Sequence, residues 1–176
     1  MCIRDSFAIA LPDMLISKED GKNGDSLKQM KINFDKYKKS SILLGKARKE
    51  DIPKYGIAKI IKTNKFPCLG LIKKIIEKPS IKKAPSNLYA TGRYIFNNDL
   101  FKYLNKVEPD KSGEIQLTDA IDQYISDDNQ VMAFALDGEV YDCGDKTEYV
   151  LANIDFASRD PLMKIKIKNF LKKKLF

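Results

Sequence analysis

The 176-residue sequence predicts an α/β protein with a mixed, mostly parallel sheet and flanking helices. Short apolar runs, which are typical of strands, alternate along the chain with segments whose apolar residues recur at helical spacing. With 43% hydrophobic and 32% charged residues the chain can bury a core. No apolar run approaches the roughly 20 residues needed to span a bilayer. We therefore expect a compact cytoplasmic protein.

The amino-terminal elements are predicted from apolar patterning. Residues 7–11 form an apolar run that ends at a proline, which is typical of a buried strand. A helix is expected over 26–39, with Ser26 as its N-cap, because apolar residues recur there every three or four positions. Its apolar face consists of Leu27, Met30, Phe34 and Tyr37. Residues 41–44 are the next predicted strand, and the glycines and mixed charges of 18–25 indicate a loop.

The middle of the chain is rich in predicted strands. Residues 56–61 and 69–76 are two apolar runs separated by a polar turn, and 88–96 is a third that contains a glycine. A short helix is expected after these strands, near Leu100. The middle of the chain therefore supplies most of the expected sheet.

The carboxyl-terminal third returns to alternating helices and strands. An amphipathic helix is predicted over 117–126, followed by strands over 131–136 and 140–141 around an Asp-Gly turn. A further helical region starts near Tyr149. This order supports a single domain, which we place over 7–157.

The basic charge is concentrated at the end of the chain. The net charge is +8, and the tail from Ser158 onward supplies +6 of it, so the rest is nearly neutral. Apolar residues at roughly helical spacing lie between the lysines of this tail. We predict a basic amphipathic helix over 158–176 that packs on its own fold or on a second subunit of a homo-oligomer. Nucleic-acid or membrane binding is not expected.

The residue inventory excludes several kinds of chemistry. The chain has no histidine, so a Ser-His-Asp triad and an imidazole metal site are impossible within it. Cys2, Cys68 and Cys143 form no CxxC pair and no even disulfide framework. Carboxylates, lysines and a bound metal remain for catalysis, an inventory that suits phosphoryl or nucleotidyl transfer.

Two aspartates lie where predicted strands end. Asp13 follows the first strand and its proline, and Asp142 follows 140–141 directly. Carboxylates in such positions can ligate a hard cation such as Mg²⁺, although each is also an ordinary turn residue. A functional metal site requires that the two strand ends meet.

Two polar segments lie beside other predicted elements. Glu77 and Lys78 end the strand at 69–76, where they form either a solvated ion pair or a site for sugar hydroxyls and a phosphate. Thr118 and Asp119 open the helix at 117–126. For these two residues we favour helix capping over a role in a site.

Seven sequence blocks together resemble the bacterial UTP–glucose-1-phosphate uridylyltransferases, in the order of that family. The blocks are Leu11-Pro12-Asp13, Lys54-Tyr55-Gly56-Ile57, Ile75-Ile76-Glu77-Lys78-Pro79, Ala84-Pro85-Ser86-Asn87, Gly92-Arg93-Tyr94, Glu114-Ile115-Gln116-Leu117-Thr118-Asp119-Ala120 and Asp142-Cys143-Gly144. The sixth and seventh blocks are the most specific. The resemblance runs from about Phe7 to near the end and suggests the carboxyl-terminal portion of such an enzyme.

The resemblance implies a nucleotide-diphospho-sugar transferase (Rossmann-like) fold. It also implies the conversion of UTP and glucose 1-phosphate to UDP-glucose and pyrophosphate. By this analogy Asp13 and Asp142 hold Mg²⁺, Gly56 and Glu77 bind glucose, and Lys78 faces the sugar phosphate as the catalytic residue.

Departures from the family pattern leave other functions open. The glycine-rich loop that cradles the triphosphate in this family is missing, so we expect the chain to be inactive alone. Residues 1–6 do not resemble the family and are interpreted as a foreign or unstructured start. Asp145 stands where the family more often has asparagine. A non-catalytic interaction or oligomerisation module is the main alternative, and a thymidylyl- or other sugar-1-phosphate nucleotidyltransferase is another. The sequence assigns neither the base nor the hexose.

Overall fold

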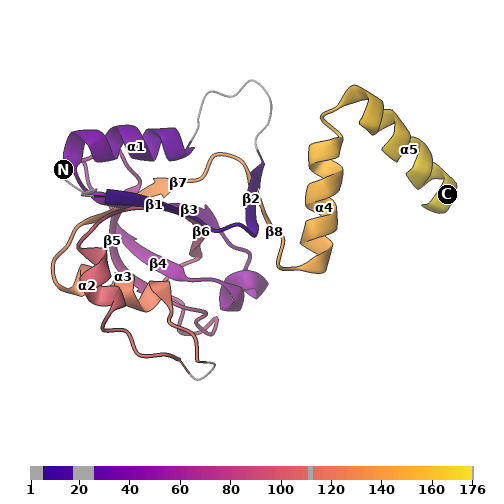
Figure 1. The fold of residues 1–176 in the computed structure, drawn as a ribbon. Helices are drawn as coiled ribbons and strands as arrows, with labels where there is room; N and C mark the ends of the chain where they lie inside the picture. The colour runs from indigo at the N-terminus through magenta and orange to yellow at the C-terminus, as the bar shows by residue number, and fades with distance from the viewer. Residues whose placement is uncertain (1–5, 18–25, 111–112, 176) are drawn as a thin grey trace. The chain divides into compact units, whose positions relative to one another are not determined.

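The computed structural model describes residues 6–17, 26–110 and 113–175, which form two compact units. The first unit contains the described residues of Met1–Ala10 and Asn23–Asp137, and the second those of Leu11–Lys22 and Gly138–Phe176 (Figure 1). The predictions for residues 1–5 and for the loop at 18–25 fall outside the described part of the chain. The two units are described separately below.

The first unit is built on a six-stranded sheet with the strand order β1-β6-β3-β7-β5-β4. Its strands are β1 (Ser6–Ala10), β3 (Ser40–Lys46), β4 (Ile57–Ile61), β5 (Gly70–Ile76), β6 (Leu88–Asn97) and β7 (Val131–Ala135). Every one of these strands was predicted from its apolar run, and the observed ends lie within two residues of the predicted ends. The mixed α/β class is therefore confirmed.

The expectation of a mostly parallel sheet is wrong. Among the described strands only β3 and β7 pair in parallel, and the other pairings are antiparallel. The reason is that β6 lies between β1 and β3 and runs against both, while β4 and β5 pair as antiparallel neighbours. Alternation of helices and strands indicates crossovers, but it does not reveal a long strand inserted between two parallel ones.

Helices cover both faces of this sheet, with α1 on one face and α2 and α3 on the other (Figure 1). They are α1 (Ser26–Tyr37), α2 (Leu100–Leu104) and α3 (Leu117–Ser126). The predicted apolar faces pack inward, since Met30 and Phe34 of α1 and Ile121 and Tyr124 of α3 are buried. The main core joins α2 and α3 to the sheet.

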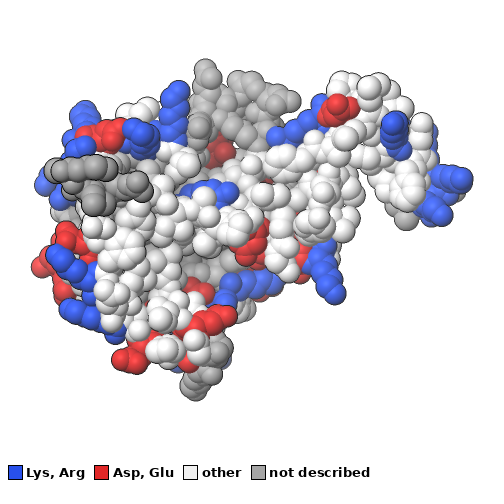
Figure 2. Space-filling view, viewed as in Figure 1, with Lys and Arg blue, Asp and Glu red and all other residues white. Residues whose placement is uncertain are grey.

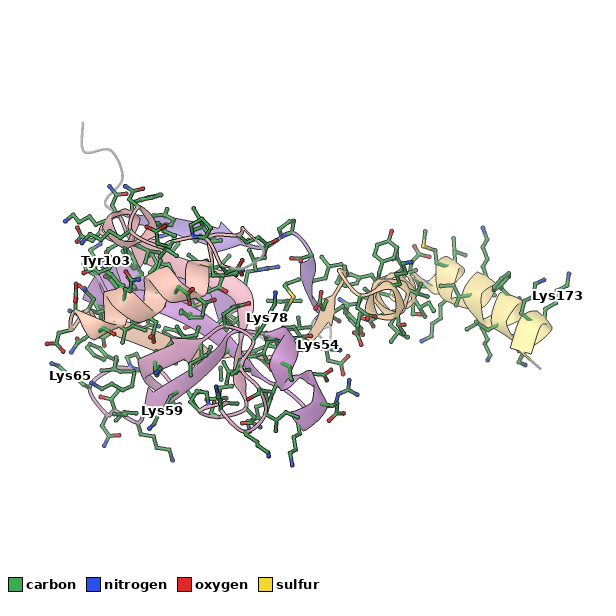
Figure 3. The ribbon with its side chains drawn as sticks, turned by 90° about the horizontal axis from the view of Figure 1, so that it is seen from below. Lys54, Lys59, Lys65, Lys78, Tyr103 and Lys173 are labelled. Carbon is green, nitrogen blue, oxygen red and sulfur yellow. The ribbon has the colours of Figure 1, made fainter. Side chains whose placement is uncertain are left out.

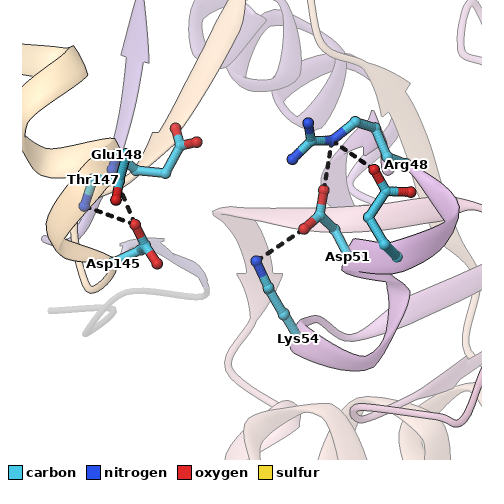
Figure 4. A network of polar contacts seen from close by, with 7 residues as sticks. Arg48, Asp51, Lys54, Asp145, Thr147 and Glu148 are labelled. Atoms are coloured by element: carbon cyan, nitrogen blue, oxygen red, sulfur yellow. Dashed lines mark hydrogen bonds and ion pairs between the residues drawn. The ribbon is translucent and has the colours of Figure 1, made fainter.

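A short 3-10 helix, η1 (Lys49–Lys54), connects β3 to β4 and was not predicted. Asp51 holds it together, because its carboxylate accepts hydrogen bonds from Arg48 Nε at 2.7 Å and from Lys54 Nζ at 2.9 Å (Figure 4). The hydrogen bonds from Lys54 and Arg48 lower the pKa of Asp51. This network fixes the turn that leads into Gly56.

The second unit contains a two-stranded antiparallel sheet and two helices. Its elements are β2 (Met14–Ser17), β8 (Glu139–Asp142), α4 (Lys146–Ala157) and α5 (Pro161–Leu175). The sequence patterns did not predict β2. Asp145 caps α4, since its carboxylate accepts from the backbone N–H of Thr147 at 2.8 Å and of Glu148 at 3.0 Å (Figure 4).

The carboxyl-terminal helix is present, and lysines gather at its far end (Figure 2). Leu162, Met163, Ile165 and Phe170 of α5 are exposed. No described helix is long and apolar enough to cross a membrane. The division of the chain at residues 6 and 157 stays a prediction, as does packing of this helix on a second subunit.

Candidate functional site

Glu77 and Thr118 form a hydrogen-bonded pair in the first unit. Glu77 follows the last residue of β5, and its side chain is 22% exposed. Its Oε2 accepts a hydrogen bond from Thr118 Oγ1 at 2.6 Å. Thr118 is buried in the first turn of α3. A charge-assisted bond of this length fixes the direction in which the carboxylate points.

Gly56 lies against this pair because of the register between β4 and β5. Ile57 pairs with Ile76, so the residues just outside that pair, Gly56 and Glu77, are neighbours. A Cβ on Gly56 would lie 3.1 Å from Glu77 Oε2 and 3.3 Å from Thr118 Oγ1. A side chain at position 56 would therefore crowd the carboxylate and the hydroxyl, and glycine lets both lie close to the backbone.

Lys78 places a cation beside the same carboxylate. Its Nζ lies 3.8 Å from Glu77 Oε1, and its side chain is 57% exposed (Figure 3). Its backbone has φ 41°, in the left-handed region, and its N–H donates to Tyr55 O at 3.1 Å. An exposed ion pair at this distance contributes little stability, so the ammonium can turn toward an anionic ligand.

The charge of Glu77 also reaches a buried tyrosine. Burial raises the pKa of the Tyr94 phenol, and the negative charge of Glu77 raises it further. Tyr94 is 6% exposed and belongs to the main core. A buried phenol of the core therefore lies within electrostatic reach of the Glu77 carboxylate.

Asp13 and Asp142 meet in the second unit around Gly144. Met14 of β2 pairs with Asp142 of β8, and the Cys143 N–H donates to Asp13 O at 2.8 Å. A Cβ on Gly144 would lie 3.1 Å from Asp142 Oδ1 and 3.9 Å from Asp13 Oδ2. The requirement that the two strand ends meet is satisfied, because the unpredicted strand β2 brings them together.

This carboxylate pair fits a divalent cation. Within the described ranges no cluster of three or more Asp, Glu, His or Cys residues could hold a metal, so at most two carboxylates of the described residues converge here. Magnesium is commonly held by one or two carboxylates, with waters and substrate phosphates completing its octahedral shell. Two anions so close to one glycine also repel each other unless a cation lies nearby.

Thr118 and Asp119 differ from the capping roles expected for them. The N-cap of α3 is Gln116, and no side chain caps this helix. Thr118 instead donates to Glu77, so a residue of the site was missed. The family-like block Glu114–Ala120 contains Thr118 and could have pointed to a role in the site. A hydroxyl in the first turn of a helix, however, more often caps that helix. Asp119 has a raised pKa because of partial burial and the neighbouring Asp122 and Asp110.

A mixed α/β sheet with a carboxylate–hydroxyl cluster and a carboxylate pair suits an enzyme that moves phosphorylated groups with a divalent cation. The chain belongs to the nucleotidyl transferase family, whose match covers residues 2–159. The predicted transferase class and fold are thereby confirmed.

Curated relatives and solved structures agree with this family. The UTP–glucose-1-phosphate uridylyltransferase of Haemophilus influenzae is 36% identical over 96% of this chain and 57% of its own length. A Staphylococcus saprophyticus enzyme of that name is 36% identical over 96% and 56%. A UDP-glucose pyrophosphorylase complexed with UDP-glucose has a TM-score of 0.79 and 31% identity, covering 90% of this chain and 59% of that one.

The chain spans a little more than half the length of the curated relatives it matches. The expectation of a partial match is therefore confirmed. A share of this size is consistent with an amino-terminal piece, so the carboxyl-terminal placement expected from the resemblance is not confirmed.

Proposed function

We propose that this chain supplies the sugar- and metal-binding part of a UTP–glucose-1-phosphate uridylyltransferase. The observation that carries the proposal is the cluster at the end of β5. There the Glu77 carboxylate and the Thr118 hydroxyl lie against the backbone of Gly56, and the Lys78 ammonium lies beside the carboxylate. Relatives of that name, 36% identical to this chain, support the choice of reaction.

The cluster suits a hexose phosphate because it offers an acceptor and a cation side by side. Glu77 accepts hydrogen bonds from sugar hydroxyls, and its bond from Thr118 holds it ready for them. Gly56 lets the sugar approach the backbone. Lys78 faces the phosphate, where its charge stabilises the oxygens that become more negative during transfer.

The reaction requires no covalent enzyme intermediate. An oxygen of the sugar phosphate forms a bond to the α-phosphorus of UTP, and the bond from that phosphorus to the departing pyrophosphate breaks. We propose that Asp13 and Asp142 hold the Mg²⁺ ion, which when bound neutralises part of the triphosphate charge. The protein's own contribution is to hold the sugar phosphate in line and to exclude competing orientations.

Titration of the 176-residue chain with UDP-glucose, followed by NMR, tests the assignment. We expect saturable shifts at Gly56, Glu77 and Thr118, and much weaker binding by Lys78→Ala. Lys82→Ala is the matched control, because Lys82 is an exposed loop lysine of the same unit. A parallel titration with dTDP-glucose tests which nucleotide base the chain prefers. Absence of saturable shifts with either nucleotide sugar would favour the non-catalytic interaction module instead.

Turnover by the isolated chain is a separate test. We expect no UDP-glucose from UTP, glucose 1-phosphate and Mg²⁺, because the chain has no glycine-rich loop to cradle the triphosphate. Robust turnover by the purified chain would contradict this expectation. Homo-oligomerisation and cytoplasmic location of the whole protein stay predictions.

A further inference from the structure

A short strand ladder in the second unit brings the two aspartates of the candidate cation site together. β2 and β8 pair over the four residues of β2, beginning with Met14 opposite Asp142 (Figure 1). Asp13 directly precedes this ladder, so its position relative to Asp142 depends on the register of the two strands. A two-stranded ribbon is only marginally stable in water, and a slip of one residue turns its side chains to the opposite face. The site therefore depends on whatever holds β2 in place.

The far end of β2 is held by a side-chain cluster at the carboxyl-terminal end of α4. Ser17, the last residue of β2, is 6% exposed, and its Oγ donates to Asp155 Oδ2 at 2.6 Å. Arg159 Nη2 lies 2.8 Å from the same Asp155 oxygen and also donates to Ser17 Oγ. The Arg159 Cζ lies 4.5 Å from the centre of the Phe156 ring. A buried hydroxyl and a guanidinium thus converge on the Asp155 carboxylate.

Strand β8 faces the same carboxylate through Tyr141. Leu15 pairs with Tyr141, so Ser17 and Tyr141 lie on one face of the ladder. The hydrogen bond from Ser17 lowers the pKa of the Asp155 carboxyl, and the hydrogen bond and charge of Arg159 lower it further. Burial raises the pKa of the Tyr141 phenol, and the negative charge of Asp155 raises it further. Asp155 therefore interacts with side chains from both strands of the ladder.

We infer that Asp155 is a positioning residue for the cation site, because its bond to Ser17 holds β2 in the register that brings the two aspartates together. This role rests on the proposed function of Asp13 and Asp142, and it acts through the backbone of β2 rather than on the cation. Without Asp155 the buried Ser17 hydroxyl loses the acceptor of its hydrogen bond, which is unfavourable. Arrangements in which β2 leaves this register then become more populated.

Mn²⁺ binding by the 176-residue chain tests this role. From the broadening of the Gly144 NMR signal, Asp155→Ala should weaken the affinity for Mn²⁺ by roughly tenfold, the lower end of the cost of losing a group that positions metal ligands. Asp155→Asn keeps an oxygen that can accept from Ser17, so it should recover most of the affinity. Asp160→Ala is the matched control. It removes the same charge from the same unit, but Asp160 accepts from backbone N–H groups at the start of α5.

Ser17→Ala completes a double-mutant cycle. Alone it should weaken Mn²⁺ binding, and together with Asp155→Ala it should cost little more than Asp155→Ala does, because the two side chains act as one unit. Cross-strand NOE contacts between Met14 and Asp142 report the register without any metal. They should weaken in Asp155→Ala and persist in Asp160→Ala. Thermal unfolding verifies that the variants are folded, and if Asp155→Ala is not, Ser17→Ala carries the same comparison.

Three results overturn the inference. They are cross-strand contacts that persist in Asp155→Ala, an unchanged affinity of that variant for Mn²⁺ when the unaltered chain binds the ion, and equal losses in Asp155→Ala and Asp160→Ala. A different result separates this role from the proposed function. If the unaltered chain binds no Mn²⁺ but Asp155→Ala still loses the contacts between Met14 and Asp142, the positioning role holds and the metal assignment fails.

Discussion

The two candidate subsites of this chain hold negative charge in different ways. Glu77 has a hydroxyl donor at 2.6 Å and an ammonium at 3.8 Å. Asp13 and Asp142 converge on Gly144. The Gly144 N–H donates a hydrogen bond to Asp142 Oδ1 at 3.1 Å. The first subsite is organised by the protein itself, whereas the second leaves much of its charge for a bound cation to balance. Mutations should therefore act on geometry at the first and on metal affinity at the second.

The largest expected effect is at the aspartate pair. In an active protein containing this chain, Asp13→Asn and Asp142→Asn should each lower magnesium-dependent kcat/KM by roughly two orders of magnitude or more, because each removes a charged ligand. The double change should cost much less than the two single losses combined, since the residues act as one site.

Metal binding by the chain itself provides a second measurement. Mn²⁺ should broaden the NMR signals of Gly144 and its neighbours in the unaltered chain, and both variants should abolish this broadening. Unchanged broadening in the two variants, together with unchanged magnesium dependence, would return both aspartates to ordinary turn residues.

The next largest effect on kcat/KM is expected for Lys78→Ala. If Lys78 contacts the sugar phosphate as proposed, loss of its ammonium should lower kcat/KM by about two orders of magnitude, because a charge-assisted contact that stabilises the transition state is worth several kcal/mol. Lys82→Ala and Lys83→Ala should change kcat/KM little, since both side chains are exposed. Steady-state kinetics on the three variants decides the matter, and equal losses would show that Lys78 has no special role.

Thr118→Val should have a smaller and more selective effect. It removes the donor to Glu77 while keeping the shape of the side chain, so the KM for glucose 1-phosphate should rise about tenfold. The KM for UTP should stay nearly constant, and Thr118→Ser should restore the sugar affinity. A rise in both KM values, without rescue by serine, would indicate a purely structural role.

The smallest effect concerns the stability of α3. Partial burial and two acidic neighbours raise the pKa of Asp119, so the folded state binds this proton more tightly than the unfolded state. Stability from this group is therefore greatest at acidic pH and is lost as pH rises through the carboxyl range. Asp119→Asn should raise Tm slightly at pH 7 and reduce this pH dependence. Thermal unfolding between pH 3 and pH 7 measures both, and a lower Tm at pH 7 would contradict the assignment.

Local patterns predicted most of the elements. The helix at 117–126 was predicted with its observed ends, because its buried residues recur with a clear helical period. The sheet topology could not be obtained in this way. The proximity of Gly56 to Glu77 follows from the pairing of Ile57 with Ile76, and such a register is invisible to a local pattern.

The residues of the candidate site show the same difference between local patterns and long-range pairing. Its acidic residues and Lys78 were found at strand ends or through the family resemblance, whereas Thr118 was assigned to its helix because its partner is 41 residues away. The meeting of Asp13 with Asp142 depends on the pairing of β2 with β8, two segments more than 120 residues apart. What the sequence could not supply was the pairing of distant segments.

At Lys78 the residue that would best suit the backbone conformation is not the residue that the proposed function requires. A residue other than glycine at φ 41° costs roughly 1 kcal/mol relative to an ordinary conformation. Glycine would remove that strain and, with it, the ammonium beside Glu77. A screen that selects only for thermostability would thus tolerate or favour glycine at position 78. Sequences designed for robustness alone would lose the charge that we propose faces the sugar phosphate, without any loss of fold.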